Sequence, residues 1–256
     1  MNRPSYFLSD IHFASPTDPR CIRARRFLRS LAGEAEAIYL VGDVFDFWLG
    51  YKSVVFSDFF PVFRVFAELV EAGTRVILFS GNHDPDPGAF LQGLGVEVFH
   101  SAQEFTIDGQ RIWLEHGDTI DPRGWVRRGI CSLVRASPIR RLARSFHPDF
   151  AWNLSRIYAR KEEDYSEPLP DELKSVFFPA KIAEGYTAVI IGHYHRAVHQ
   201  KETRAENVHH FFVLGDWVKH FTFMRYSQGQ FELRRLTGDG LQSEVMPLGD
   251  HAPFDD

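Results

Sequence analysis

Seven side chains of types that bind metal ions follow five apolar runs in this sequence. They offer carboxylate, amide and imidazole donors without a thiolate, a combination that suits manganese, iron or zinc better than calcium or a sulfur-bound structural zinc. Seven donors exceed one coordination shell that must also admit water, whereas two metal ions sharing a carboxylate accommodate them and can act on a phosphoryl group. The candidate ligands are Asp10, His12, Asp43, Asn82, His116, His193 and His195.

The runs that precede these residues are predicted to be buried strands. Short runs rich in β-branched and aromatic residues, followed by turn-forming residues, are typical of such strands. Open α/β sheets bind ligands at the carboxyl ends of their strands, so the five ends can converge on one site. A single His116 or Asn82 would more often be structural, but unrelated reasons would not place ligand types at five strand ends. The predicted strands span 6–9, 37–41, 75–80, 111–115 and 188–191.

Two pairs of candidate ligands are separated by a single residue. They are Asp10 with His12 and His193 with His195. Residues two apart in an extended segment point to the same face. Each pair is therefore expected to reach one site from an extended backbone.

The rest of the pattern predicts a layered α/β core. Apolar spacing predicts helices at 20–31 and 57–72 and a short helix near 88–94. Strand–helix alternation followed by late hairpins indicates an α/β class with antiparallel strands toward its end. Asp216 and Trp217 are expected to support the core, and the tail from Pro247 is expected to be frayed. The further strands are predicted at 96–99, 105–107, 211–214, 221–226 and 230–236.

The composition indicates one globular domain, 1–256, with an insertion at 121–180. The net charge of −5 argues against wholesale nucleic-acid binding. The two cysteines, Cys21 and Cys131, form neither a metal-type pair nor a disulfide framework. Because no run resembles a signal peptide or a membrane-spanning helix, a cytoplasmic location is expected.

Five short motifs resemble those of the calcineurin-like metallophosphoesterases. They are Asp10-x-His12, Gly42–Asp43, Gly81–Asn82–His83–Asp84, the block at His116, and Gly192–His193-x-His195. The resemblance covers the chain except about 121–180 and implies a layered β-sandwich flanked by helices, with a helical insertion as a lid. It also implies that two metal ions share Asp43 and hold a hydroxide nucleophile. The first ion would also take Asp10, His12 and His195, and the second Asn82, His116 and His193.

Two longer motifs resemble the UDP-2,3-diacylglucosamine hydrolase branch of this superfamily, which acts in lipid A biosynthesis. They are Gly42–Asp43–Val44–Phe45–Asp46–Phe47–Trp48 and Leu214–Gly215–Asp216–Trp217. Enzymes of that branch cleave the pyrophosphate of a UDP-linked, doubly acylated sugar into UMP and the acylated sugar 1-phosphate, typically with manganese. The resemblance implies an acylated UDP-sugar substrate, two Mn²⁺ ions, and substrate contacts from Asn82, His83 and His193.

The stretch from Arg123 to Lys161 is basic and amphipathic. It holds ten basic residues against one acid, Asp149, interleaved with apolar residues. Such a helical segment over a metal site can bind an anionic headgroup and acyl chains, and can rest on the inner membrane surface. The alternative is a solvated charged face over a small satellite core. Its position between two ligand motifs favours substrate binding, with Arg156 and Lys161 as the first candidates.

His83 and Asp84 are the candidate catalytic residues. Many enzymes of the branch carry arginine where this chain has His83. A protonated histidine, oriented here by Asp84, can protonate an alkoxide leaving group, whereas a phosphate leaving group needs positive charge more than a proton. His83 is compatible with pyrophosphate cleavage and leaves open a phosphodiesterase or phosphatase for a soluble nucleotide or another phosphoester. A non-catalytic scaffold is the remaining alternative.

Overall fold

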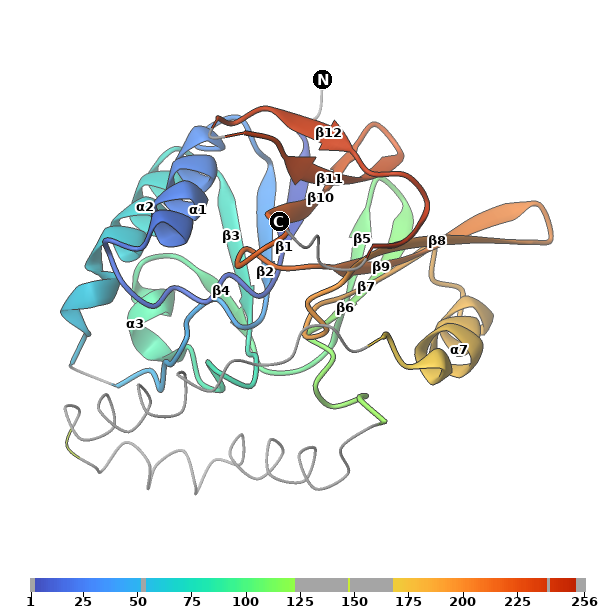
Figure 1. The fold of residues 1–256 in the computed structure, drawn as a ribbon, viewed down its shortest axis with the longest axis horizontal. Helices are drawn as coiled ribbons and strands as arrows, with labels where there is room; N and C mark the ends of the chain where they lie inside the picture. The colour runs from blue at the N-terminus through green and yellow to red at the C-terminus, as the bar shows by residue number, and fades with distance from the viewer. Residues whose placement is uncertain (1–2, 52–53, 123–146, 148–167, 239, 252–256) are drawn as a thin grey trace.

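A computed structural model describes residues 3–51, 54–122, 147, 168–238 and 240–251 of the chain. Within these residues two β-sheets face one another, and helices cover their outer faces (Figure 1). This arrangement confirms the expected layered α/β class.

The first sheet contains the strands that carry the early ligand motifs. Its strands are β1 (Ser5–Leu8), β2 (Ala37–Val41), β3 (Arg75–Phe79), β4 (Glu97–Phe99), β10 (Thr222–Ser227), β11 (Gln230–Leu236) and β12 (Ser243–Val245). They lie in the order β12-β11-β10-β1-β2-β3-β4. β1 to β4 are parallel to one another, whereas β10 runs antiparallel to β1.

The second sheet carries the late motifs. Its strands are β5 (Gln103–Ile107), β6 (Gln110–Glu115), β7 (Ala188–Ile191), β8 (Ala197–Arg204), β9 (Asn207–Leu214) and β13 (Gly249–His251). Their order is β13-β8-β9-β7-β6-β5, with β6, β7 and β9 parallel and the others antiparallel to their neighbours. In both sheets, every strand that ends in a candidate ligand has a parallel neighbour.

Alternate residues of the central strands serve two different cores. In β2, Tyr39 and Val41 lie in the apolar cluster between the sheets, whereas Ile38 and Leu40 lie in the cluster beneath the helices. A strand that is buried on both faces is apolar at every position. This burial explains why the strand runs were visible in the sequence.

Helices complete the outer layers. α1 (Pro19–Ser30), the 3₁₀ turn η1 (Ser57–Phe59), α2 (Phe60–Glu71) and α3 (Gly88–Gly93) contribute to the cluster on the first sheet. α1 begins after Asp18, whose carboxylate accepts a hydrogen bond from the Arg20 amide at 2.8 Å. η2 (Leu173–Phe177), a turn of π-helix, and α7 (Phe178–Ala183) cover the second sheet, where Phe178 stacks on Phe211.

Three features differ from the expectations. β8 was not predicted because its second half is polar, and it pairs with a β9 that starts four residues earlier than the apolar run. The predicted helix 57–72 begins as a 3₁₀ turn. The prediction of a frayed tail is wrong for residues 249–251, because β13 pairs there with β8. Asp250 of this strand also contacts Lys174 at 3.1 Å and Arg196 at 2.9 Å.

Most of the predicted insertion lies outside the described residues, including its expected amphipathic helices, Arg156 and Lys161. Its final part, 168–180, is described, and there Leu169, Leu173 and Phe178 are buried against the second sheet. None of the helices in the described ranges has the length and apolar character needed to cross a bilayer.

Candidate metal centre

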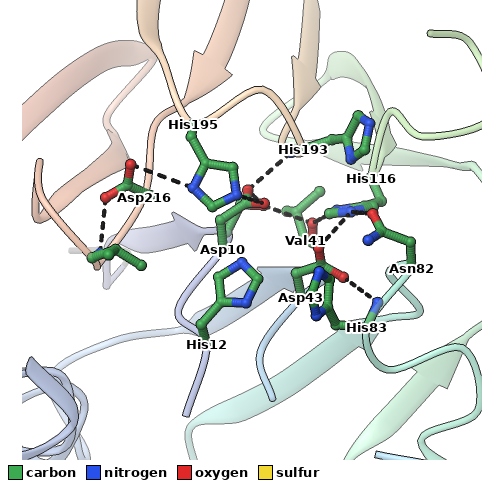
Figure 2. A network of polar contacts seen from close by, with 12 residues as sticks. Asp10, His12, Val41, Asp43, Asn82, His83, His116, His193, His195 and Asp216 are labelled. Carbon is green, nitrogen blue, oxygen red and sulfur yellow. Dashed lines mark hydrogen bonds and ion pairs between the residues drawn. The ribbon is translucent and has the colours of Figure 1, made fainter. Parts of the chain in front are cut away.

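The seven candidate ligands meet where the carboxyl ends of five strands converge (Figure 2). Asp10 and His12 follow β1, Asp43 follows β2 and Asn82 follows β3 in the first sheet. From the second sheet, His116 follows β6, and His193 and His195 follow β7. The expectation that distant motifs converge on one place is therefore met, with ligands arriving from both sheets.

One group consists of Asp10, His12 and His195. One ligand atom from each lies within 4.8 Å of the others, and all three side chains are buried. Nε2 of His195 lies 3.3 Å from Oδ1 of Asp10, and the rings of His12 and His195 stack with centroids 5.1 Å apart. The group joins the end of β1 in the first sheet to the end of β7 in the second.

A second group consists of Asp43, His116 and His193, again within 4.8 Å. Nε2 of His116 lies 3.3 Å from Oδ2 of Asp43 and 3.2 Å from Oδ1 of Asn82. Nδ1 of His116 donates to the carbonyl of Val41 at 2.9 Å, which leaves Nε2 as the atom that faces the oxygen donors. Together with the neighbouring Asn82, the second group offers an amide, a carboxylate and two imidazoles.

The two groups fit metal ions on the chemistry of their donors. Oδ1 of Asp10 and Nε2 of His12 are buried without a hydrogen-bond partner among the described residues, and such atoms are costly unless something binds them. Burial disfavours the charged form of His116, but Asp43 outweighs this effect and raises the pKa of His116 to about 10. The place between Nε2 of His116 and Oδ2 of Asp43 thus favours positive charge, which suits a divalent cation.

The ligand loops adopt a left-handed backbone rather than the expected extended one. The φ angle is +54° at Asp10, +52° at His12, +50° at Asp43, +70° at His193 and +51° at His195. For residues with a Cβ atom this conformation costs about 1–2 kcal/mol each. The prediction that each pair of ligands lies on an extended backbone is therefore wrong, because the backbone turns sharply after each strand. Strain of this kind persists where surrounding contacts enforce it.

Asp84 enforces part of this backbone. Its carboxylate is fully buried and accepts hydrogen bonds from the amides of Gly81 (2.7 Å), Asp43 (3.1 Å), Val44 (2.8 Å) and Phe45 (3.3 Å). Burial and the nearby Asp43 raise the pKa of Asp84 to about 6. Asp84 therefore orders the loops after β2 and β3, and its orienting of His83 stays a prediction.

The His83 ring contacts Asp46 and His12. Nδ1 of His83 donates to the carbonyl of Asp46 at 2.9 Å, and the His83 ring meets the His12 ring edge-on at 4.8 Å. The carboxylate of Asp46 lies 3.4 Å from Nδ1 of His12. Asp46 therefore contacts both a candidate ligand and the candidate acid.

Two carboxylates that sequence reasoning did not assign to the site contact candidate ligands. Asp216, expected only to support the core, lies 3.5 Å from Nδ1 of His195 and 2.7 Å from Nδ1 of His220. Burial opposes its ionisation, but these two histidines outweigh burial and lower the pKa of Asp216 far below its usual range. Asp121 lies 3.5 Å from Nε2 of His193. Asp216 follows β9 as the ligands follow their strands, and that position was the available signal.

Comparisons with known proteins agree with this geometry. A family model of calcineurin-like phosphoesterases matches residues 4–197. Proteins named UDP-2,3-diacylglucosamine hydrolase are similar over most of their length. The one from Ralstonia nicotianae is 30% identical over 84% of this chain and 84% of its own. The one from Azotobacter vinelandii is 30% identical over 82% of this chain and 89% of its own. The one from Neisseria gonorrhoeae is 28% identical over 93% of this chain and 96% of its own.

Paired buried groups of histidine and aspartate at the strand ends of a two-sheet α/β fold define a metal-dependent phosphoesterase. The chain belongs to the calcineurin-like phosphoesterase family. It is accordingly a hydrolase whose site is suited to divalent metal ions.

Proposed function

We propose that this chain hydrolyses the pyrophosphate bond of UDP-2,3-diacylglucosamine to UMP and the diacylated sugar 1-phosphate, a step of lipid A biosynthesis. The observation that carries the proposal is the pair of buried ligand groups, present in a chain that aligns nearly end to end with hydrolases of that name. A phosphoesterase site accounts for the reaction type, and the relatives' names support the substrate.

Two divalent ions, which we take to be Mn²⁺, are the proposed cofactors. When bound, they supply the positive charge that stabilises a phosphoryl group under attack. Because only two of the proposed ligands are carboxylates, a loaded site keeps a net positive charge, which favours an anionic pyrophosphate. The proposed ligands of the first ion are Asp10, His12, Asp43 and His195, and those of the second are Asp43, Asn82, His116 and His193.

His83 is the proposed partner of the leaving group. Its Nδ1 is committed to the carbonyl of Asp46, so Nε2 is the atom that can donate to a substrate oxygen when the ring is protonated. The sugar phosphate that leaves is already a weak base, and it needs a positive charge nearby more than a proton. A protonated His83 supplies that charge, as arginine would. Asn82 and His193 are proposed to contact the same phosphates.

Arg156 and Lys161 are proposed to contact the anionic, acylated part of the substrate, and the basic insertion to bring the enzyme to the membrane surface where that substrate resides. Both residues lie outside the described part of the chain. This part of the proposal rests on the pattern of charge in the sequence.

The test is release of UMP from UDP-2,3-diacylglucosamine in detergent micelles. The protein is first stripped with a chelator and then reloaded with Mn²⁺, and a non-acylated UDP-sugar and a generic phosphodiester serve as comparison substrates. We expect UMP release that requires Mn²⁺ and favours the acylated substrate. Good turnover of the phosphodiester without UMP release would instead assign the enzyme to a soluble phosphoester. A Mn²⁺-loaded protein that is inert on all three substrates would indicate a scaffold.

A further inference from the structure

The turn that follows β9 holds a carboxylate in one fixed position. Asp216 is fully buried, and its Oδ1 accepts hydrogen bonds from the amides of Val218 (2.8 Å), Lys219 (2.6 Å) and His220 (3.1 Å). Its Oδ2 lies 2.7 Å from Nδ1 of His220 and 3.5 Å from Nδ1 of His195. The three amides leave the carboxylate no freedom to rotate, so Oδ2 must stay beside the two imidazoles.

The same turn contacts a ligand loop of the other sheet. The amide of Trp217 donates to the carbonyl of Asp10 at 3.0 Å, and the fully buried Trp217 ring packs on Phe27 of α1 with centroids 5.0 Å apart. Adjacent residues therefore hold Asp10 through its backbone and His195 through its ring. These are the two ligands whose Oδ1 and Nε2 atoms lie 3.3 Å apart.

We propose that Asp216 is a positioning residue for the first metal ion: it keeps a proton on Nδ1 of His195, so that Nε2 presents its lone pair beside Asp10. A carboxylate behind a metal-binding histidine commonly fixes both the tautomer and the ring orientation. The turn 215–220 then contacts both Asp10 and His195 and fixes the distance between Oδ1 of Asp10 and Nε2 of His195. The inference rests on the proposed metal site and is independent of the proposed substrate.

Asparagine at position 216 places a hydrogen-bond donor where Oδ2 of Asp216 offers an acceptor to His195. The three backbone amides require an acceptor, so the side-chain oxygen of D216N stays at the Oδ1 position. Its NH₂ group must then replace Oδ2 and face Nδ1 of His195. A donor there favours the tautomer whose proton is on Nε2, and that proton blocks metal binding. Loss of a partner behind a metal ligand costs about 10- to 100-fold in metal affinity.

The experiment titrates the metal-free full-length protein with Mn²⁺ by calorimetry and counts bound ions after equilibrium dialysis. D216N is expected to bind one ion with wild-type affinity and the other about 10- to 100-fold more weakly. The matched control is D108N, at the β5–β6 turn far from the ligands, where asparagine tolerates the positive φ of +49°. A folded D216N that binds two ions as the wild type does would overturn the proposal.

A second measurement needs no variant at position 216 and so decides the matter if D216N does not fold. Wild-type protein with ¹⁵N-labelled histidine is loaded with ¹¹³Cd²⁺, and His195 is assigned by the signals missing in H195Q. We expect coupling between cadmium and Nε2 of His195, with a proton retained on Nδ1. Coupling to Nδ1 instead would refute the proposed role of Asp216. Because neither measurement contains substrate, a failure of the proposed reaction leaves both results interpretable.

Discussion

Replacing Gly81 with alanine is expected to disable the proposed metal centre without altering any candidate ligand. A Cβ atom at Gly81 would lie 2.8 Å from Cγ of Asp43, and closer still to Oδ1 and the backbone nitrogen of that residue. Neither side can yield easily, because the amides of Gly81 and Asp43 both donate to the same buried carboxylate of Asp84. The methyl group therefore pushes directly on the carboxylate proposed to be shared by the two ions.

The magnitude follows from the distances. Ordinary Cβ contacts begin at 3.4 Å, so Cγ of Asp43 must move by about 0.6 Å and its nearer atoms by more. A misplacement on the order of 1 Å in a catalytic constellation costs about 100-fold in rate. Overpacking of a rigid buried site also destabilises the fold by about 1–3 kcal/mol. We therefore expect activity to fall about 100-fold and Mn²⁺ binding to weaken at both sites.

Three measurements test this expectation: the metal content after dialysis, the hydrolysis of a generic phosphodiester, and urea unfolding. Gly93→Ala is the matched control, because Gly93 likewise lacks a positive φ and a Cβ atom there meets nothing within 4 Å. It lies at the end of α3, where alanine is neutral or slightly stabilising. If G81A kept two ions and activity within about threefold of the wild type, the reasoning from close approach would be wrong.

Two further predictions concern histidines. His83→Ala should lower kcat about 100-fold, and His83→Arg should restore pyrophosphate cleavage better than hydrolysis of an alkyl phosphoester; equal restoration of both would contradict a charge-stabilising role. His199 and His210 contact each other at 3.1 Å, and burial lowers their pKa values to about 3 and about 4. Because the unfolded chain binds these protons below about pH 6.5 and the fold does not, each should reduce stability by up to about 1.4 kcal/mol per pH unit on acidification toward pH 4. Urea unfolding between pH 7 and 5 should show a shallower decline in H199Q/H210Q, and an unchanged slope would refute this assignment.

Local sequence was sufficient for the elements that are buried on both faces. β2 and β7 were predicted with their observed bounds because every residue in them is apolar. β8 was missed for the opposite reason: its outer half is exposed and polar, and only its pairing with β9 makes it a strand. β13 likewise pairs with β8 through residues remote in sequence, and its Asp250 contacts Lys174 and Arg196.

The candidate ligand types and their convergence could be predicted from the sequence, because each follows an apolar strand in a parallel part of a sheet. Residue types and spacing do not say which of them lie together, and the grouping was implied only by the family resemblance. The facing of the two sheets brings His195 beside Asp10 and His116 beside Asp43. Local spacing also gave the wrong backbone at the ligand loops, since their left-handed residues are held by long-range contacts such as those of Asp84.

The contacts of Asp216 and Asp121 with the candidate ligands are visible only in the tertiary structure. Asp216 looks like a core residue in the sequence because its partner His195 is 21 positions away and on another strand. Its position after β9 was a signal, but that position does not distinguish a carboxylate that caps a turn from one that also contacts a ligand. The sequence alone thus determined the chemistry available to this protein, namely carboxylates, an amide and imidazoles at strand ends. The packing of one sheet against the other decided which atoms meet, because only that packing brings strand ends remote in the chain within a few ångströms.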